Sequence, residues 1–179
     1  MSIFVRIIDQ GTSTPLDFPL DVSGNPISLI ARKIAEFGLK VDEPIGGTVP
    51  EGFFNFVKLN GSVGVENADT EPMTIRLTVT RRNTFTHPIA SPIIDGVINV
   101  PIFALEENVP GQVPDVMGRQ TISFEFTEGG IEGLIPAAYY EYTLWIQSEL
   151  PFIIPVVPPT ENGPIAFSGV SSVREIFFF

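Results

Sequence analysis

Apolar and polar residues alternate along much of the chain with a period of two, the pattern of β-strands that bury one face. The clearest run is MTIRLTVTRR at 73–82, with apolar side chains on one side and mostly threonines on the other. The same alternation occurs in the runs VKLNGSVGVE from Val57, TISFEFTE from Thr121 and YYEYTLWIQS from Tyr139. Each run predicts a strand with one face in a core.

Turn residues separate these runs. The segment ENADTEP at 66–72 predicts a hairpin loop, and IDGV at 94–97 contains an Asp-Gly turn. The 17 prolines and 16 glycines bound the short strands elsewhere. The proline-rich segment LPFIIPVVPPTENGP at 150–164 is interpreted as an extended edge strand, a loop that crosses the sandwich or a stiff arm. Strands bounded in this way predict an all-β, antiparallel sandwich of jelly-roll type that forms one domain over 1–179.

One segment has a different period. In NPISLIARKIAEFGL, Asn25 is a suitable helix N-cap, Pro26 suits the first turn, and Gly38 suits the position after the last turn. The apolar residues between them recur every three or four positions. The spacing predicts a short helix over 26–37 that packs over an open end or edge of the sheets.

Both ends of the chain predict strands, at residues 2–8 and 173–179, that are apolar on two faces. Consecutive strand residues point to opposite faces, so one sheet cannot bury all three of the final phenylalanines. We therefore expect the helix or a second subunit to cover them. The expected assembly contacts are Ile3, Phe4, Val5, Ile7, Ile176, Phe177, Phe178 and Phe179.

Composition narrows the class of protein. The net charge is −11, the charged residues are only 17% of the chain, and its few basic residues are scattered, so nucleic-acid binding is not expected. No apolar run reaches the length of a membrane helix, so we expect no membrane insertion. Arg6 and Asp9 interrupt the apolar N-terminal run, which therefore lacks the core of a classical signal peptide.

Candidate chemistry is sparse. There is no cysteine, and His87 is the only histidine, which is too few for a catalytic triad or a histidine metal site. We expect neither an enzyme nor a cofactor. The acidic loop with Glu66, Asn67, Asp69 and Glu71 carries oxygen ligands suited to calcium, but a solvated turn explains it better.

Aromatic residues offer one alternative to a structural role. Tyr139 and Trp145 fall on the face of their strand opposite Tyr140 and Tyr142 and could form a stacking platform for a sugar. Packing at a sheet interface is the competing interpretation of the aromatic residues.

The stretches FVKLNGSVGVENADTEPMTIRLTVTRR and IPAAYYEYTLWIQSE resemble the small jelly-roll domains of surface and appendage proteins in spore-forming Firmicutes. The resemblance covers about half the chain and implies a fibre subunit that is assembled at a cell or spore surface without a classical signal peptide. Several such subunits cross-link through N-terminal cysteines, which this chain lacks. The resemblance implies an architecture and a role, but no site residues.

Three hypotheses follow from the sequence. The first is a noncatalytic protein that assembles with copies of itself into a filament or surface layer, with a viral capsid, fibre or decoration protein as a close variant. The second is a carbohydrate-binding module that uses Tyr139 and Trp145. An enzyme is the third and least favoured hypothesis. Jelly-roll metalloenzymes usually bring two or more histidines to the metal, whereas this chain has one.

Overall fold

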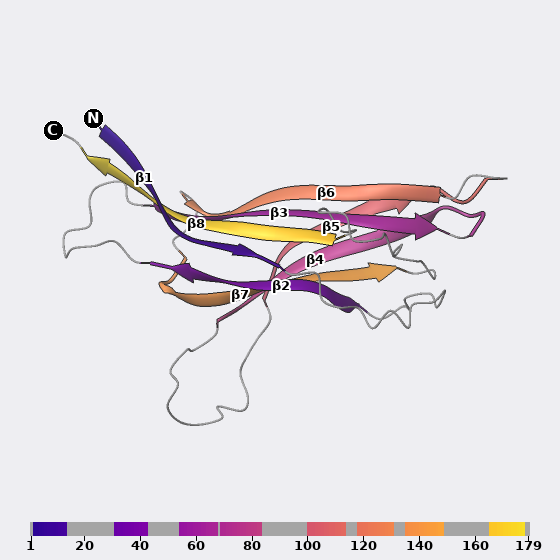
Figure 1. The fold of residues 1–179 in the computed structure, drawn as a ribbon, viewed down its shortest axis with the longest axis horizontal. Helices are drawn as coiled ribbons and strands as arrows, with labels where there is room; N and C mark the ends of the chain where they lie inside the picture. The colour runs from indigo at the N-terminus through magenta and orange to yellow at the C-terminus, as the bar shows by residue number, and fades with distance from the viewer. Residues whose placement is uncertain are drawn as a thin grey trace, which may run out of the picture.

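The alternating runs form strands in the computed structural model, and the strands build two antiparallel sheets that pack face to face (Figure 1). The residues described are 2–13, 31–42, 54–67, 69–83, 100–113, 118–130, 135–148 and 165–177. Sheet A contains, in spatial order, β1 (Ser2–Thr12), β8 (Ile165–Phe177), β3 (Phe54–Asn67) and β6 (Gly118–Gly129). Sheet B contains β2 (Arg32–Val41), β7 (Ala138–Ser148), β4 (Met73–Asn83) and β5 (Val100–Val109). The fold is the expected all-β sandwich, with a jelly-roll-like strand order.

The core lies between the sheets and contains the side chains that alternation predicted. Leu59 of β3 and Leu77 of β4 are fully buried, as are Tyr142 and Leu144 of β7. On β6, Ile122 and Phe124 are buried whereas Phe126 is only partly buried. Period-two alternation therefore identified the inward faces of these strands correctly.

Side-chain and backbone contacts close the two long sides of the sandwich. On one side, the Phe103 ring of β5 stacks on Phe124 of β6 with the centroids 5.0 Å apart. On the other side, β1 passes over β2, where a Cβ at Gly11 would lie 2.8 Å from the Gly38 carbonyl oxygen. A glycine is needed at this crossing because the two backbones approach so closely.

The predicted helix over 26–37 is wrong for residues 32–37, which belong to β2, while 26–30 lie outside the described residues. A β-bulge between Lys33 and Ala35 adds one residue to the strand, so Ile34 and Ala35 are both buried. Because the bulge turns Ile34 inward, the buried residues Ile34 and Phe37 are three positions apart in the sequence. The same spacing is typical of one face of a helix.

The predicted hairpin at 66–72 is also wrong, because β3 and β4 belong to different sheets and do not pair. The loop crosses between the sheets. Asn67 organises it by donating to the Glu71 carbonyl oxygen (2.8 Å) and accepting from the Asp69 amide (2.9 Å). The Asp-Gly turn at 94–97 and the proline-rich segment at 150–164 lie outside the described residues.

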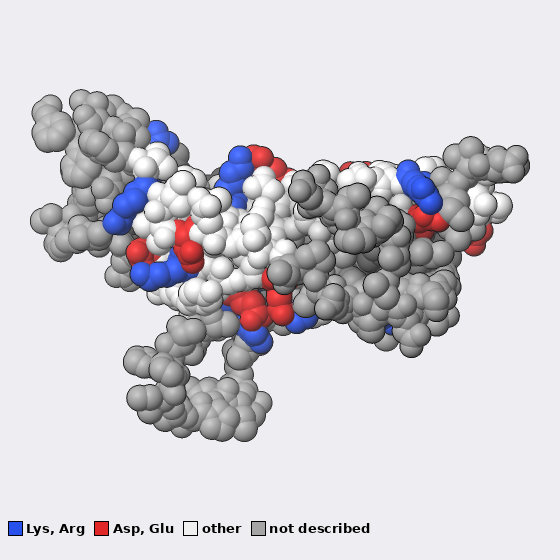
Figure 2. All heavy atoms as spheres, viewed as in Figure 1, with Lys and Arg blue, Asp and Glu red and all other residues white. Residues whose placement is uncertain are grey.

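Charged side chains form small mixed clusters on the face that Figure 2 shows, separated by uncharged surface. Cross-strand pairs explain part of this pattern: Lys58 pairs with Glu125 on sheet A, and Arg76 with Glu106 on sheet B. Such exposed pairs contribute little to stability. Within the described ranges, no helix has the length and hydrophobicity needed to cross a membrane.

Candidate functional site

The two ends of the chain lie side by side, because β1 and β8 form an antiparallel pair (Figure 1). The backbone register sets Ile3 opposite Ile176, Phe4 opposite Glu175, and Phe177 opposite Ser2. The expected assembly residues of 2–8 and 173–177 are thus gathered at one end of sheet A. Phe178 and Phe179 lie outside the described residues.

β8 is an interior strand, whereas β1 is at the edge. β8 pairs with β1 on one side and with β3 on the other, so its ladder positions are used within the chain. Within the described part of the chain, β8 is the one strand that pairs with β1. Of the two terminal strands, β1 alone therefore presents a sheet edge.

The two halves of β1 differ. Its second half covers the edge of β2: Asp9 Oδ2 accepts from the Lys40 amide (2.8 Å), and Ser13 Oγ, just beyond the strand, accepts from the Glu36 amide (3.2 Å). A register shift between Ile7 and Asp9 marks the change of direction. The first half runs with the end of β8 beyond β2 and β7 (Figure 1).

An apolar surface lies on the outer face of sheet A at this end. Register sets Val5 and Phe54 on either side of Arg174, and Ile7 and Phe56 on either side of Ser172. Directly opposed residues of an antiparallel pair share a face. We call the four side chains of Val5, Ile7, Phe54 and Phe56 the terminal apolar surface.

Exposure across this surface is uneven. Val5 is 60% and Ile7 56% exposed, whereas Phe54 and Phe56 are half-buried. The sequence indicated Val5 and Ile7 as contact residues, but it did not indicate the two phenylalanines of β3. Their position became apparent only from the register between β3 and β8, which the alternation of either strand alone does not specify.

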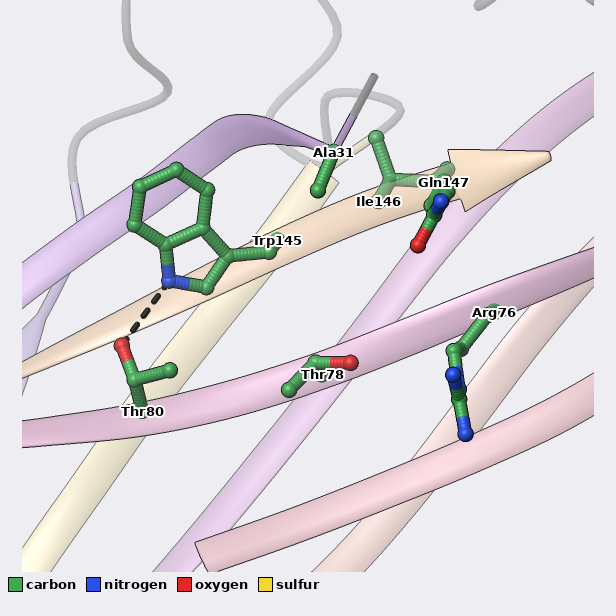
Figure 3. Close-up of a pocket in the computed structure, with 7 residues that line it drawn as sticks. All are labelled: Ala31, Arg76, Thr78, Thr80, Trp145, Ile146 and Gln147. Atoms are coloured by element: carbon green, nitrogen blue, oxygen red, sulfur yellow. Dashed lines mark hydrogen bonds between the residues drawn. The ribbon is translucent and has the colours of Figure 1, made fainter. Parts of the chain in front are cut away.

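A second feature is a depression of about 200 Å³ on the outer face of sheet B, beside Trp145 (Figure 3). Its floor and rim come from β4 and β7 and from the residue before β2. The lining residues are Ala31, Arg76, Thr78, Thr80, Trp145, Ile146 and Gln147. We call this feature the Trp145 depression.

Trp145 is held in place by a hydrogen bond from its indole nitrogen to Thr80 Oγ1 (2.8 Å), drawn in Figure 3. Thr78 lies directly opposite Trp145 in the ladder, and Arg76 lies opposite Gln147. The sequence placed Arg76, Thr78 and Thr80 on a solvated face, but not beside Trp145. The strand pairing supplies that information.

Tyr139 does not line the Trp145 depression. It shares the outer face of β7 with Trp145 but lies six residues away, about 20 Å along the strand. Its ring instead covers Gly38 of β2, where an added Cβ would come 2.5 Å from Tyr139 Cε1. The two aromatic residues that the sequence suggested therefore do not form one continuous platform.

A polar cluster joins the two sheets. Arg81 of β4 pairs with Glu128 of β6, and the Tyr142 hydroxyl donates to Glu128 Oε2 (3.2 Å). The Arg81 guanidinium also lies 4.8 Å from the centre of the Tyr140 ring. Burial raises the pKa of Glu128, although Arg81 and the Tyr142 hydrogen bond oppose the rise, and burial also raises the pKa of both tyrosines.

This cluster fits a structural role. Arg81 and Tyr142 both bond to Glu128 across the sandwich, and none of the three lines the Trp145 depression. An arginine and a tyrosine satisfy the half-buried Glu128 carboxylate, as burial of a charge requires.

The acidic loop uses its oxygens internally. Glu66 is buried and accepts from Arg119 Nε (2.9 Å), and Asn67 is committed to the turn described above. Among the described residues, no group of three or more histidine, aspartate or glutamate side chains is arranged to hold a metal ion. His87 lies outside those residues.

Comparison with protein-family models gave no match, and comparison with curated proteins gave no match either.

Proposed function

We propose that this protein is a noncatalytic structural subunit that assembles with copies of itself through the end of sheet A formed by β1 and β8. The observation that carries the proposal is the exposure of Val5 (60%) and Ile7 (56%) on the edge strand β1. Large apolar side chains that lie together on an exposed surface are typical of contact sites. Covering these two side chains would contribute about 2–3 kcal/mol in total.

The backbone of β1 supports the same proposal. An edge strand has N–H and C=O groups that can pair with a strand from another chain, and main-chain pairing then adds to side-chain burial. The first half of β1, before the register shift at Ile7, lies beyond the part that covers β2. A neighbouring subunit would pair there.

Charge also supports a second copy as the partner. Arg6 and Arg174 are exposed on β1 and β8, within a chain whose net charge is −11. Basic side chains at an apolar contact complement an acidic surface, and complementary charge guides association. The chain as a whole carries the opposite net charge.

The resemblance to appendage subunits of spore-forming Firmicutes supports assembly into a filament or surface layer at a cell or spore surface. A capsid, fibre or decoration protein of a virus is the related alternative, since jelly rolls also form closed shells. Electron microscopy of the purified protein distinguishes closed shells from filaments.

The decisive experiment compares wild-type protein with the double variant Val5→Lys/Ile7→Lys by multi-angle light scattering across a range of concentrations. We expect wild-type mass above 19.5 kDa and a double variant at 19.5 kDa. The matched control is Val100→Lys/Val113→Lys, which adds the same charge at valines that are 43% and 56% exposed. A monomeric wild type, or assembly that survives in the double variant, overturns the proposal.

A further inference from the structure

Trp145 is the only tryptophan of the chain, and it lies on the outer face of sheet B rather than in the core. Its neighbours Leu144 and Ile146 are fully buried on the opposite face, whereas Trp145 itself is half-buried. Its bulk therefore does not fill the space between the sheets. It forms part of a surface.

The hydrogen bond to Thr80 fixes the orientation of the indole ring. Figure 3 shows the fused rings of the Trp145 indole nearly face-on, with the strands of the sandwich passing behind them. Because the indole N–H is already used by Thr80, the ring offers a ligand its π-face rather than a hydrogen bond. A flat apolar face of this kind packs well against another flat, weakly polar face.

Small side chains shape the depression beside the ring. Thr78 lies directly opposite Trp145, and Ala31, the residue before β2, also lines the depression. The volume of about 200 Å³ is below the roughly 300–1,000 Å³ of pockets for drug-sized ligands. It suits a single ring of a longer ligand that rests on the sheet.

The rim of the depression carries hydrogen-bonding groups without net charge. Arg76 is paired with Glu106 (3.2 Å), and Lys33, opposite Trp145 on β2, is paired with Glu36 (2.9 Å). Of the residues that line the depression, Arg76 is the one cation, and it has a carboxylate beside it. This balance, and the overall charge of −11, favour a neutral polar ligand over a phosphate or a nucleic acid.

We propose that the Trp145 depression binds a neutral saccharide, with one pyranose ring stacked on the indole and its hydroxyls bonded to Arg76, Thr78 and Gln147. The C–H face of the sugar packs on the ring, and the rim groups supply donors and acceptors for its edge. This site is separate from the terminal apolar surface, which lies on sheet A. The two proposals therefore stand or fall independently.

The sole tryptophan makes the test direct, because all indole emission comes from the site. The probes are tetrasaccharides of β-1,4-linked glucose, β-1,4-linked N-acetylglucosamine and α-1,4-linked glucose. We expect a saturable change in Trp145 emission with at least one of them. Repeating the titration with the Val5→Lys/Ile7→Lys variant separates sugar binding from assembly, since the variant keeps the depression.

Variants locate the binding. By calorimetry, Trp145→Ala and Gln147→Ala should each weaken affinity about tenfold, and Gln147→Ala changes an exposed rim residue without touching the core. Tyr139→Ala is the matched control: an exposed tyrosine of the same strand and face, which should leave affinity within about twofold. The proposal is overturned if no probe alters the emission at about 10 mM, or if Tyr139→Ala weakens binding as much as Trp145→Ala.

Discussion

The side chain of Asn55 forms two hydrogen bonds with the backbone of Ile135, a residue 80 positions further along the chain. The Asn55 amide nitrogen donates to the Ile135 carbonyl oxygen (2.5 Å), and the Ile135 amide donates to Asn55 Oδ1 (2.8 Å). Asn55 is 2% and Ile135 4% exposed. The asparagine thus replaces a strand as the partner of the segment that leads into β7.

We expect Asn55→Ala to lower the free energy of unfolding by about 2–4 kcal/mol, because it leaves a buried N–H and a buried C=O of Ile135 without partners. The measurement is urea denaturation followed by circular dichroism. Asn83→Ala removes an exposed asparagine from the end of β4 and is the control. Equal losses for the two variants would contradict this account of Asn55.

Gly11→Ala should separate β1 from β2. The new Cβ would lie 2.5 Å from Phe37 Cδ2 and 2.8 Å from the Gly38 carbonyl oxygen, and the backbone oxygen cannot move away cheaply. We expect a loss of about 1–3 kcal/mol in the free energy of unfolding. Gln10→Ala, at an exposed position next to it, is the control. Faster amide exchange at Glu36 and Lys40, which Ser13 and Asp9 protect, would support the mechanism; unchanged exchange and stability would refute it.

Burial of Glu128 predicts a pH dependence of stability with a defined sign. The pKa of Glu128 is raised in the folded protein, so the folded state holds this proton more tightly than the unfolded state. Its contribution is fully present below the unfolded value of about 4.3 and is lost as pH rises through the folded pKa. The free energy of unfolding of wild type, relative to Glu128→Gln, should therefore fall across this range.

Denaturation from about pH 4 to about pH 7 measures this difference. Glu125→Gln, which removes an exposed carboxylate from the outer face of the same strand, corrects for the loss of one negative charge. A difference that is constant with pH, or that grows as pH rises, would show that burial does not control the titration of Glu128.

How much of this fold the sequence predicts depends on how regular each strand is. In β4 the apolar residues alternate with polar ones, and in β7 every second residue from Tyr140 to Ile146 is apolar, so Leu77 and Leu144 were assigned correctly to the core. In β2 one bulge next to Lys33 broke the alternation, and helical spacing appeared instead. A local irregularity of one residue was enough to change the predicted element, because both periodicities are short.

Pairing between strands was beyond the reach of the sequence pattern. Turn residues at 66–72 mark a change of direction, but they do not specify that β4 enters the other sheet. For the same reason Trp145 could be placed on an outer face, whereas its neighbours Thr78 and Arg76 could not be assigned to it. Site residues on adjacent strands become visible only when register is known.

The position of β8 between β1 and β3 has a consequence for how the chain reaches its final form. β1 cannot pair into sheet A until β8 has been synthesised, and the two strands are far apart in the sequence, as the pairing of Ser2 with Phe177 shows. Pairings so distant in sequence form slowly. Until β8 is available, β1 and the facing edge of β3 lack the strand that pairs with both of them, and the same strand of another newly made chain offers the same pairing. Strand exchange requires a second chain, so dilution during refolding favours single subunits over chains linked by exchanged β8 strands.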